Sequence, residues 1–331
     1  MIEAVLRAAP RVGAGEVSLV RADARGLYAS DVSRALADAL AGGLSVIEVA
    51  AEPDTEALVG EVVRSSGARD RAIVVARVPD RGRPSRAFQP IPTPALVAAI
   101  DATLRATRLD AVPLALLAIR ADWRDHTAWA ELRGTCERLI GAGKVLGWAA
   151  ALDPADDSAA RIVDEPWLSA IAAPLALCQR AALPLLAAAA ARPIAMLARF
   201  PLAGGALAGG IGPGMKLHPT DDRTALDDGT LERCAVVAAQ LAALVKREPE
   251  VARSCAAARA AHEAMRRPDH LECMTIAELA LRFVIDRGAI ALPRLHRPEY
   301  VREALACAIA APLSAALHAE LDRLAESWAT A

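Results

Sequence analysis

Residues 46–67 read VIEVAAEPDTEALVGEVVRSSG, and this stretch has the form of one β-strand followed by one helix. The apolar pair Val46-Ile47 runs into Glu48, a short polar loop follows, and the periodicity predicts an amphipathic helix from about Thr55. The carboxyl end of such a strand is where many α/β enzymes keep functional groups. The stretch therefore predicts a strand–helix unit that carries an acidic group at its functional end.

The same unit recurs along the whole chain. Strands are expected at Val17–Ala22, Ser45–Ala50, Ala72–Arg77, Val112–Arg120, Val145–Ala151, Leu168–Leu175, Ile194–Arg199 and Ala289–Pro293. Helices are expected near 30–42, 55–66, 94–106, 126–141, 157–163, 177–191, 274–286 and 297–308. Several strands are continuously apolar, as a parallel sheet buried on both faces requires. Eight such units predict a closed (β/α)₈ TIM barrel rather than an open doubly wound sheet.

No stretch of the chain resembles a linker, so residues 1–331 are expected to form a single barrel domain. The regular rhythm breaks only at about 203–272, between the seventh strand and its helix. This insertion holds the glycine-rich sequence GGALAGGIGPG and two helix-like runs, Leu231–Lys246 and Val251–Arg266. Insertions at the carboxyl end of a barrel strand commonly serve as lids or binding loops.

Composition narrows the possible partners and compartments. The net charge is −2 and there is no basic block, so nucleic acid is not an expected partner. The N-terminal residues lack the sustained apolar core of a signal peptide, and no uninterrupted apolar run is long enough to span a membrane. The six cysteines form no CxxC pair and the six histidines show no metal-binding spacing. We therefore expect a cytoplasmic protein with no metal site and no membrane contact, and the oligomeric state stays open.

Six segments, in order along nearly the whole chain, resemble motifs of the aldo-keto reductase family. They are IEVAAEPDTEALVGEVVRSSG (47–67), AIVVARV (72–78), LALLAIRAD (114–122), GKVLGWAAAL (143–152), ARFPLAGGALAGG (198–210) and LALRFVIDRGAIALPRLHRPEYVREAL (279–305). The resemblance implies a (β/α)₈ barrel of the aldo-keto reductase type and the reduction of carbonyls with a nicotinamide cofactor.

The four catalytic positions implied by this resemblance hold different residue types here. The family's aspartate corresponds to Glu48, its proton-donating tyrosine to Glu52 or Pro53, its lysine to Arg77, and its histidine to Arg120. An ion pair could survive at the first and third positions, because Glu48 could face Arg77. For Arg120, the alternatives are a salt bridge to Asp122 or Glu48, or a role as an anion dock together with Arg77.

These replacements remove the family's proton donor. General acid catalysis contributes typically about 10²–10⁴-fold to the rate. A glutamate donates a proton only if its pKa is raised, and two neighbouring arginines are expected to lower the pKa of Glu48. Arginine itself does not donate a proton near neutrality. The chain has only two tyrosines, Tyr28 and Tyr300, and neither lies on this loop. Ordinary carbonyl reductase activity is therefore expected to be absent.

The resemblance also indicates where NADP(H) would bind, although part of that site is changed. The candidate contacts are Leu202, Gly205 and Leu207 at the pyrophosphate, Arg294, His296 and Arg297 at a 2′-phosphate, and Glu303 at the adenine. The Ser-Asn pair that holds the carboxamide in the family corresponds to Ala151 and Leu152, and Tyr300 stands where the family often has arginine.

Three functions remain open at this point. The preferred one is a pseudoenzyme or anion-binding protein that keeps the pocket and has lost the chemistry, and its expected ligand is a small anionic molecule. The second is a divergent NADP(H)-dependent oxidoreductase that uses a different acid or a water molecule. The third is a non-redox lyase or isomerase acting on an anion, with Glu48 or Glu52 as the base and the arginines as stabilisers of negative charge.

Overall fold

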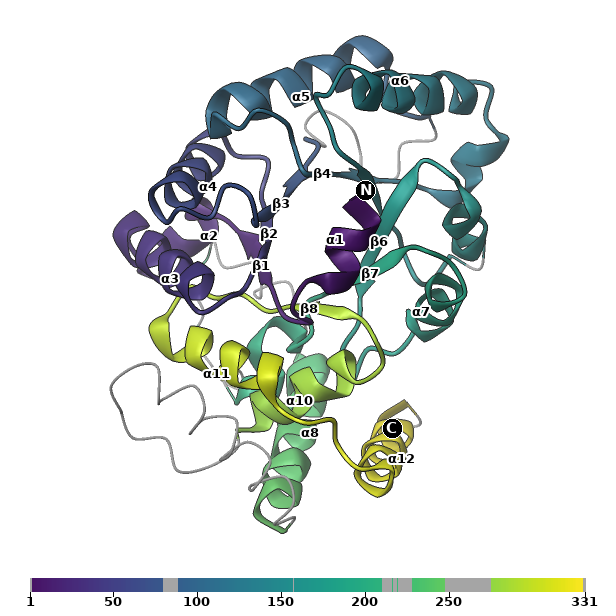
Figure 1. Ribbon diagram of the computed structural model, residues 1–331. Coiled ribbons are helices and arrows are strands. Elements are labelled where there is room, and N and C mark those ends of the chain that lie inside the picture. The colour runs from purple at the N-terminus through teal and green to yellow at the C-terminus, as the bar shows by residue number, and fades with distance from the viewer. Residues whose placement is uncertain are drawn as a thin grey trace.

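Eight parallel strands form one sheet in the computed structural model, which describes residues 2–79, 89–156, 158–209, 216, 219, 228–247 and 275–329. The strands pair in sequence order around the ring that is seen end-on in Figure 1. They are β1 (Ala14–Val17), β2 (Val46–Val49), β3 (Ile73–Arg77), β4 (Leu114–Ala118), β5 (Trp148–Ala151), β6 (Leu168–Pro174), β7 (Ala195–Arg199) and β8 (Ile290–Leu292).

The ring closes between β8 and the segment that leads into β1. The amides of Gly13 and Gly15 donate to the carbonyl oxygens of Ala291 and Pro293, at 2.9 and 2.7 Å. A Cβ atom on Gly15 would lie 1.9 Å from the carbonyl oxygen of Leu292, so this approach requires glycine. The (β/α)₈ barrel predicted from the sequence is confirmed.

Helices surround the barrel and cover one of its ends. The outer helices are α3 (Ala29–Ala41), α4 (Pro53–Ser65), α5 (Thr93–Thr107), α6 (Trp129–Gly141), α7 (Leu183–Ala190), α10 (Ile276–Ile285) and α11 (Pro298–Ile309). Three short 3₁₀ segments are η1 (Ala121–Asp125), η2 (Ala159–Asp164) and η3 (Ala203–Ala208). Helix α1 (Ile2–Ala8) lies across the amino-terminal end of the barrel, where Ile2 and Leu6 pack on the interior residues (Figure 1).

The prediction of a first strand at Val17–Ala22 is wrong. The strand ends at Val17, and α2 (Leu19–Asp23) follows at once. Ser18 caps this helix, because its side chain accepts a hydrogen bond from the amide of Arg21. Because Val17, Leu19 and Val20 are all apolar, the sequence pattern shows no break where the strand ends and the helix begins.

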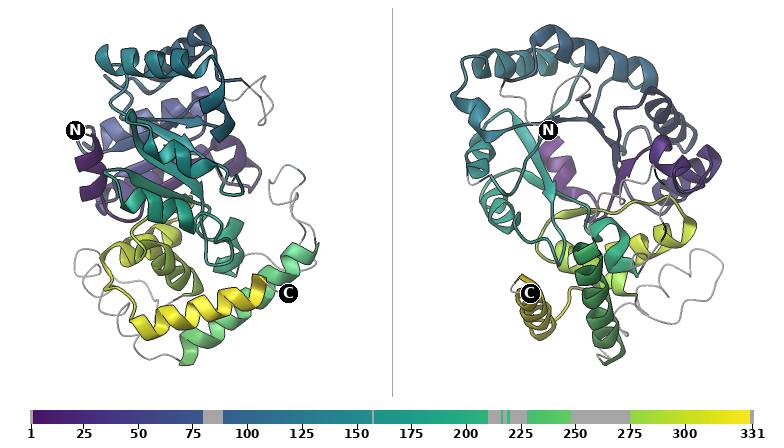
Figure 2. Two further views of the ribbon diagram at one scale, coloured as in Figure 1. Left: turned by 90° about the vertical axis from the view of Figure 1, so that its right-hand side faces the viewer. Right: turned by 180° about the vertical axis from the view of Figure 1, so that it is seen from behind.

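Two helices extend the molecule on the side of β7 and β8. Helix α8 (Asp228–Arg247) includes the predicted helix Leu231–Lys246, whereas the predicted helix Val251–Arg266 lies outside the described residues. The C-terminal helix α12 (Ala315–Ala329), for which no sequence pattern was identified, runs beside α8 (Figure 2).

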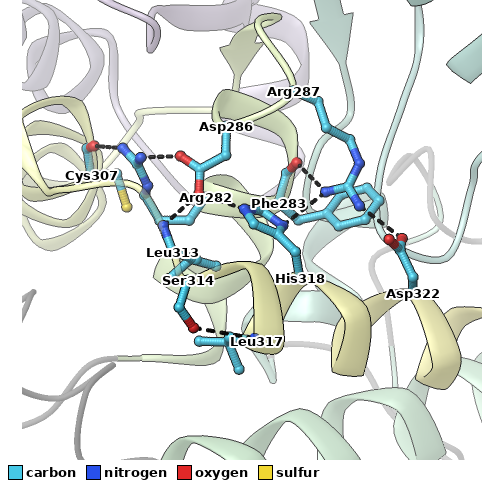
Figure 3. A network of polar contacts seen from close by, with 10 residues as sticks. All are labelled: Arg282, Phe283, Asp286, Arg287, Cys307, Leu313, Ser314, Leu317, His318 and Asp322. Atoms are coloured by element: carbon cyan, nitrogen blue, oxygen red, sulfur yellow. Dashed lines mark hydrogen bonds and ion pairs between the residues drawn. The ribbon is translucent and has the colours of Figure 1, made fainter.

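Polar contacts hold α12 against the end of α10 (Figure 3). The buried carboxylate of Asp286 pairs with Arg282, accepts from the amide of Leu313 at 2.8 Å, and lies 3.0 Å from Nε2 of His318. Farther along α12, Asp322 accepts from Arg287 at 2.7 Å. A single buried carboxylate therefore joins α10, the linker to α12, and α12 itself.

Candidate functional site

Strand alternation places a layer of charged side chains at the carboxyl end of the barrel. Val46, Val75, Leu197 and Leu292 belong to the apolar interior of the barrel. Side chains two residues apart on a strand point to the same face. The residue two positions after each of these interior residues therefore also points into the barrel. On β2, β3 and β7, and just past β8, these positions are Glu48, Arg77, Arg199 and Arg294.

On β4, β5 and β6 the same layer holds small residues. They are Ala118, Ala151 and Pro174, each two positions beyond a residue of the apolar interior. The charged groups therefore gather on one side of the barrel mouth, around β7, β8, β1, β2 and β3.

Glu16 on β1 is the centre of this charged layer. Its carboxylate lies 2.5 Å from Arg77, 3.0 Å from Arg294, 3.3 Å from Arg21 and 3.6 Å from Arg199. The Glu16 side chain is only 4% exposed, and its backbone φ of 39° lies in a region that non-glycine residues seldom adopt. A buried carboxylate that has a strained backbone and pairs with four guanidinium groups indicates a functional site that holds charged groups.

Glu48 pairs with Arg199 rather than with Arg77. The Arg199 Nε atom lies 2.9 Å from one oxygen of the Glu48 carboxylate, whose side chain is 1% exposed. Arg77 instead donates to Glu16. The predicted pair between Glu48 and Arg77 is thus wrong: two separate pairs stand in its place.

Burial raises the pKa of Glu48 above its ordinary value of 4.5, and the nearby Glu16 carboxylate adds to this rise. Arg199 and Arg77 act in the opposite direction without overcoming it. The expectation that neighbouring arginines would lower this pKa overall is therefore wrong, because the loss of hydration outweighs them.

The cluster carries more positive than negative charge. Four arginines, Arg21, Arg77, Arg199 and Arg294, surround the carboxylates of Glu16 and Glu48. Among the groups named here, the guanidinium groups outnumber the carboxylates by two. The side chains of Arg21 and Arg77 are 34% and 33% exposed, so solvent-borne anions can approach them.

Arg120 lies one layer farther out and belongs to a different contact. It follows Ala118 by two residues, and its guanidinium makes a two-pronged contact with Asp122 at 3.0 and 2.6 Å. This is the salt bridge to Asp122 that was one of the two alternatives. Among the described residues, the arginines that pair with Glu16 do not include Arg120.

Glu52 has a structural environment. It is the N-cap residue of α4, ahead of Pro53, and its two carboxylate oxygens accept from the hydroxyls of Ser18 at 2.7 Å and Thr55 at 2.6 Å. Thr55 in turn accepts from the amide of Leu19. Glu52 therefore joins the start of α2 to the start of α4, and this geometry does not favour its use as a catalytic base.

A pocket of about 620 Å³ opens beside the charged layer, within the usual size range of small-molecule sites. It is lined by the loop after β7, the end of β8, the start of α11 and residues 24–26. The predicted cofactor contacts in its lining are Leu202, Gly205, Arg294, His296, Arg297 and Glu303. Leu207 is fully buried in the core and does not line the pocket.

The loop after β7 is held in an unusual backbone conformation. Phe200, Ala203, Gly204 and Gly205 have φ values of 54°, 48°, 71° and 105°. Two of these are non-glycine residues in the left-handed region, which is costly and often marks a functional segment. The Phe200 ring faces two guanidinium groups, with the carbon of Arg199 4.9 Å and that of Arg294 5.8 Å from its centre.

Both tyrosines lie away from the charged layer. Tyr28 is 77% exposed and precedes α3. Tyr300 lies in the first turn of α11 and lines the pocket, with its ring centre 5.2 Å from that of His296. Neither is one of the residues that the family resemblance assigns to the four catalytic positions.

Metal and membrane features are absent from the part of the chain that the structure describes. There, no group of three histidine, cysteine or acidic side chains is arranged to hold a metal ion. None of the helices in the same residues is long and apolar enough to cross a membrane.

Several residues of the site were not identified from the sequence. They are Glu16, Arg21, Arg25 and Lys216. Glu16 was missed because the first strand was placed three residues too late. Counting inward positions back from each strand end would have identified Glu16, since alternation fixes which face a residue occupies. Arg199 and Phe200 lie in the segment 198–210 that the sequence did indicate, but their partners were not predicted.

Comparisons with known proteins agree with this architecture. A family model described as "Aldo/keto reductase family" matches residues 12–326. No curated protein matches the sequence.

Two solved structures illustrate the likeness in fold. An aldo/keto reductase from Klebsiella pneumoniae in complex with NADP and acetate is 21% identical, with a TM-score of 0.63, over 96% of this chain and 91% of that one. The glycerol dehydrogenase from Gluconobacter oxydans is 19% identical, with a TM-score of 0.69, over 95% of this chain and 90% of that one. Structural likeness at such low sequence identity shows a shared fold and does not show a shared activity. The activity therefore has to be argued from the site.

Proposed function

Because the chain belongs to the aldo/keto reductase family, we propose that it is a member that binds a phosphate-bearing anion and has lost ordinary carbonyl reduction. The observation that carries the proposal is the ion-pair network at the strand ends. Glu16 and Glu48 pair there with Arg77, Arg199 and Arg294, in the layer that holds Glu48 and Arg77, the positions where the family resemblance expects an aspartate and a lysine.

The network offers no accessible proton donor. Reduction of a carbonyl leaves an alkoxide that an acid must protonate. The arginines stay charged near neutrality and do not supply that proton. Glu48 has a raised pKa, yet its side chain is only 1% exposed and pairs with Arg199 at 2.9 Å, so it is poorly accessible to a substrate.

The pocket beside the network supports the proposal that the protein binds a phosphate-bearing anion. Positive charge in its lining comes from Arg25, Lys216, Arg294 and Arg297, and Glu303 is the acidic residue there. Two of these arginines also have carboxylate partners outside the lining, Glu16 for Arg294 and Glu299 for Arg297. A guanidinium group presents paired donors that match phosphate oxygens. The Klebsiella structure with NADP and acetate shows that a protein of this fold holds anionic ligands. NADP(H), or a part of it, is therefore the first ligand class to test.

The test of this proposal combines an activity assay with a binding assay on the full chain. With NADPH and nitrobenzaldehyde, we expect no oxidation of NADPH above the rate without protein. Pyrophosphate should raise the unfolding temperature, whereas sodium chloride at equal ionic strength should not. Turnover of the aldehyde would contradict the loss of chemistry, and the absence of a pyrophosphate-specific shift would contradict the anion site.

One observation favours a second candidate, a divergent NADP(H)-dependent oxidoreductase. The raised pKa of Glu48 is the property that a carboxylic acid needs to act as a proton donor. If a carbonyl substrate that oxidises NADPH is found, this candidate requires Glu48→Gln to abolish turnover. Glu61→Gln, which changes an exposed glutamate on α4, should leave it unchanged.

A further inference from the structure

The pocket beside the loop after β7 extends toward the buried carboxylate of Glu16. A second, smaller cavity is lined by Glu16 and Arg21, and it shares Arg25, Arg294 and His296 with the large pocket. Arg294 therefore borders both cavities, and its guanidinium lies 3.0 Å from the Glu16 carboxylate. An anion that binds at Arg294 is consequently separated from this buried acid by a single guanidinium group.

Charged contacts continue from Glu16 to Glu48. Arg199 contacts both acids, at 3.6 Å from the Glu16 carboxylate and 2.9 Å from that of Glu48. The guanidinium groups of Arg199 and Arg294 also lie over the same ring, that of Phe200, at 4.9 and 5.8 Å from its centre. The pocket is thus connected to Glu48 through groups in direct contact. Because these groups are largely buried, a charge added in the pocket is only weakly screened at Glu48.

Glu48 has fewer ionic contacts than Glu16 in the part of the chain that the structure describes. The guanidinium groups within 3.6 Å of Glu16 are those of Arg21, Arg77, Arg199 and Arg294. Glu48 contacts only that of Arg199, whose Nε donates to Oε2 at 3.2 Å. The other oxygen, Oε1, is buried and accepts no hydrogen bond from the described residues. Of the two acids, Glu48 is therefore the one at which an added negative charge favours protonation.

The surroundings of Glu48 already favour its protonated form. Loss of hydration raises its pKa and the carboxylate of Glu16 adds to this rise, whereas Arg199 and Arg77 oppose it. A bound anion is a further like charge, so it acts in the same direction as Glu16.

We propose that anion binding in the pocket is coupled to protonation of Glu48, whose carboxylate takes up one proton from solvent when the anion binds at Arg294. The coupling is reciprocal, so the chain with protonated Glu48 binds the anion more tightly. The physical reason is that protonation removes one of the carboxylates that compete with the ligand for the arginines. This inference rests on the proposed anion site and adds to it a dependence on pH.

Calorimetric titration of the full chain with sulfate tests the coupling. Sulfate keeps its two charges throughout the range in which glutamate and histidine titrate, so any proton taken up enters the protein. Titrations in two buffers that differ in their enthalpy of protonation give the number of protons taken up for each sulfate bound. We expect net uptake, and a dissociation constant that rises about fivefold as pH increases from 4.5 through the raised pKa of Glu48.

Three variants identify the group that takes up the proton. His296 and Glu303 line the pocket, and histidine and glutamate also titrate at acidic to neutral pH. Glu48→Gln should abolish the uptake, whereas His296→Asn and Glu303→Gln should retain it even if they bind sulfate more weakly. Full uptake in Glu48→Gln, with loss in either of the other two variants, would overturn the inference.

Infrared difference spectra give a second measurement, which on the wild-type chain does not depend on the folding of any variant. Adding pyrophosphate should increase absorption by the C=O stretch of a protonated carboxyl group, and sodium chloride at equal ionic strength should not. Glu61→Gln, which changes an exposed glutamate on α4, should give the same increase as the wild type. Anion binding without this increase, or without proton uptake, would overturn the inference and leave the anion site standing. If neither sulfate nor pyrophosphate binds, the proposed anion site fails as well.

Discussion

Burial and ion pairing act in opposite directions on Glu48. Its side chain is 1% exposed, so the charged form loses nearly all of its hydration, and this raises the pKa. Arg199 and Arg77 favour the charged form, but Glu16 opposes them with a like charge. The net result is a carboxyl group that holds its proton more tightly in the folded chain than in the unfolded one.

This balance predicts a particular dependence of stability on pH. Between the ordinary pKa of 4.5 and the raised one, the folded state binds more protons at Glu48 than the unfolded state does. The contribution of Glu48 to the free energy of unfolding is therefore largest at acidic pH and declines as pH rises through this window. Glu48→Gln removes the titrating group, so the variant should lose less stability than the wild type as pH rises from the ordinary pKa of 4.5 through the raised pKa of Glu48.

Urea unfolding at several pH values checks this prediction. Glu61→Gln is the control, because Glu61 is an exposed glutamate on α4 and its replacement should leave the pH profile unchanged. A profile for Glu48→Gln that parallels the wild type would show that Glu48 titrates alike in the folded and unfolded chain.

At the scale of elements, single polar side chains determine how neighbouring segments meet. Glu52 joins the starts of α2 and α4 through the hydroxyls of Ser18 and Thr55. Asp286 performs a similar role for the C-terminal helix, since it contacts Arg282 on α10, the amide of Leu313 and the imidazole of His318 (Figure 3). Helix α12 is therefore attached to the end of α10 through the buried carboxylate of Asp286, together with the contact between Arg287 and Asp322.

Replacing this carboxylate should release α12 before it affects the barrel. Asp286→Ala leaves Arg282 without its carboxylate partner and removes the acceptor of Leu313, so we expect a cost of about 3 kcal/mol. Hydrogen exchange should show lost protection in α12 and retained protection in the barrel strands.

The matched control for this experiment lies on α12 itself. Arg323→Ala removes a side chain that is 69% exposed, and it should leave exchange in α12 close to that of the wild type. Unchanged protection of α12 in Asp286→Ala would show that the remaining contacts, including the one between Arg287 and Asp322, are sufficient to hold the helix.

At the scale of the whole molecule, Glu16 connects segments that are distant in the sequence. It contacts Arg77 at the end of β3, Arg199 at the end of β7, and Arg294 just beyond β8. These contacts bridge the closure between β8 and β1, where the ring of the barrel is completed. The charged layer therefore contributes to barrel integrity as well as to the character of the site.

Glu16→Gln should consequently destabilise the entire barrel. Neutralising the shared acceptor leaves several arginines close together with one carboxylate fewer, and breaking buried ion pairs costs about 3 kcal/mol or more. The midpoint of urea unfolding should fall by a corresponding amount.

An exposed arginine–carboxylate contact provides the comparison. Asp122→Asn alters the contact with Arg120, where the acid is 49% exposed, and it should produce no measurable change. Equal midpoints for Glu16→Gln and wild type would mean that the charged layer contributes nothing to the closure of the barrel.

The sequence by itself determined the barrel. Strand-like runs recur eight times, several of them continuously apolar as in Ala72 to Ala76, and the hydrophobic pattern of a strand or helix is local, so it can be read without a structure. The correspondence of Glu52 or Pro53 and of Arg77 to the family's tyrosine and lysine stays a prediction from the sequence.

Only the tertiary structure decided which charges meet. Glu16 and Arg294 are 278 positions apart, and Glu48 and Arg199 are 151 apart, yet each pair is in direct contact. No local pattern specifies such partners, because they depend on how eight strands close into a ring. The raised pKa of Glu48 follows from the same closure, since desolvation is a property of the packed molecule rather than of the residue.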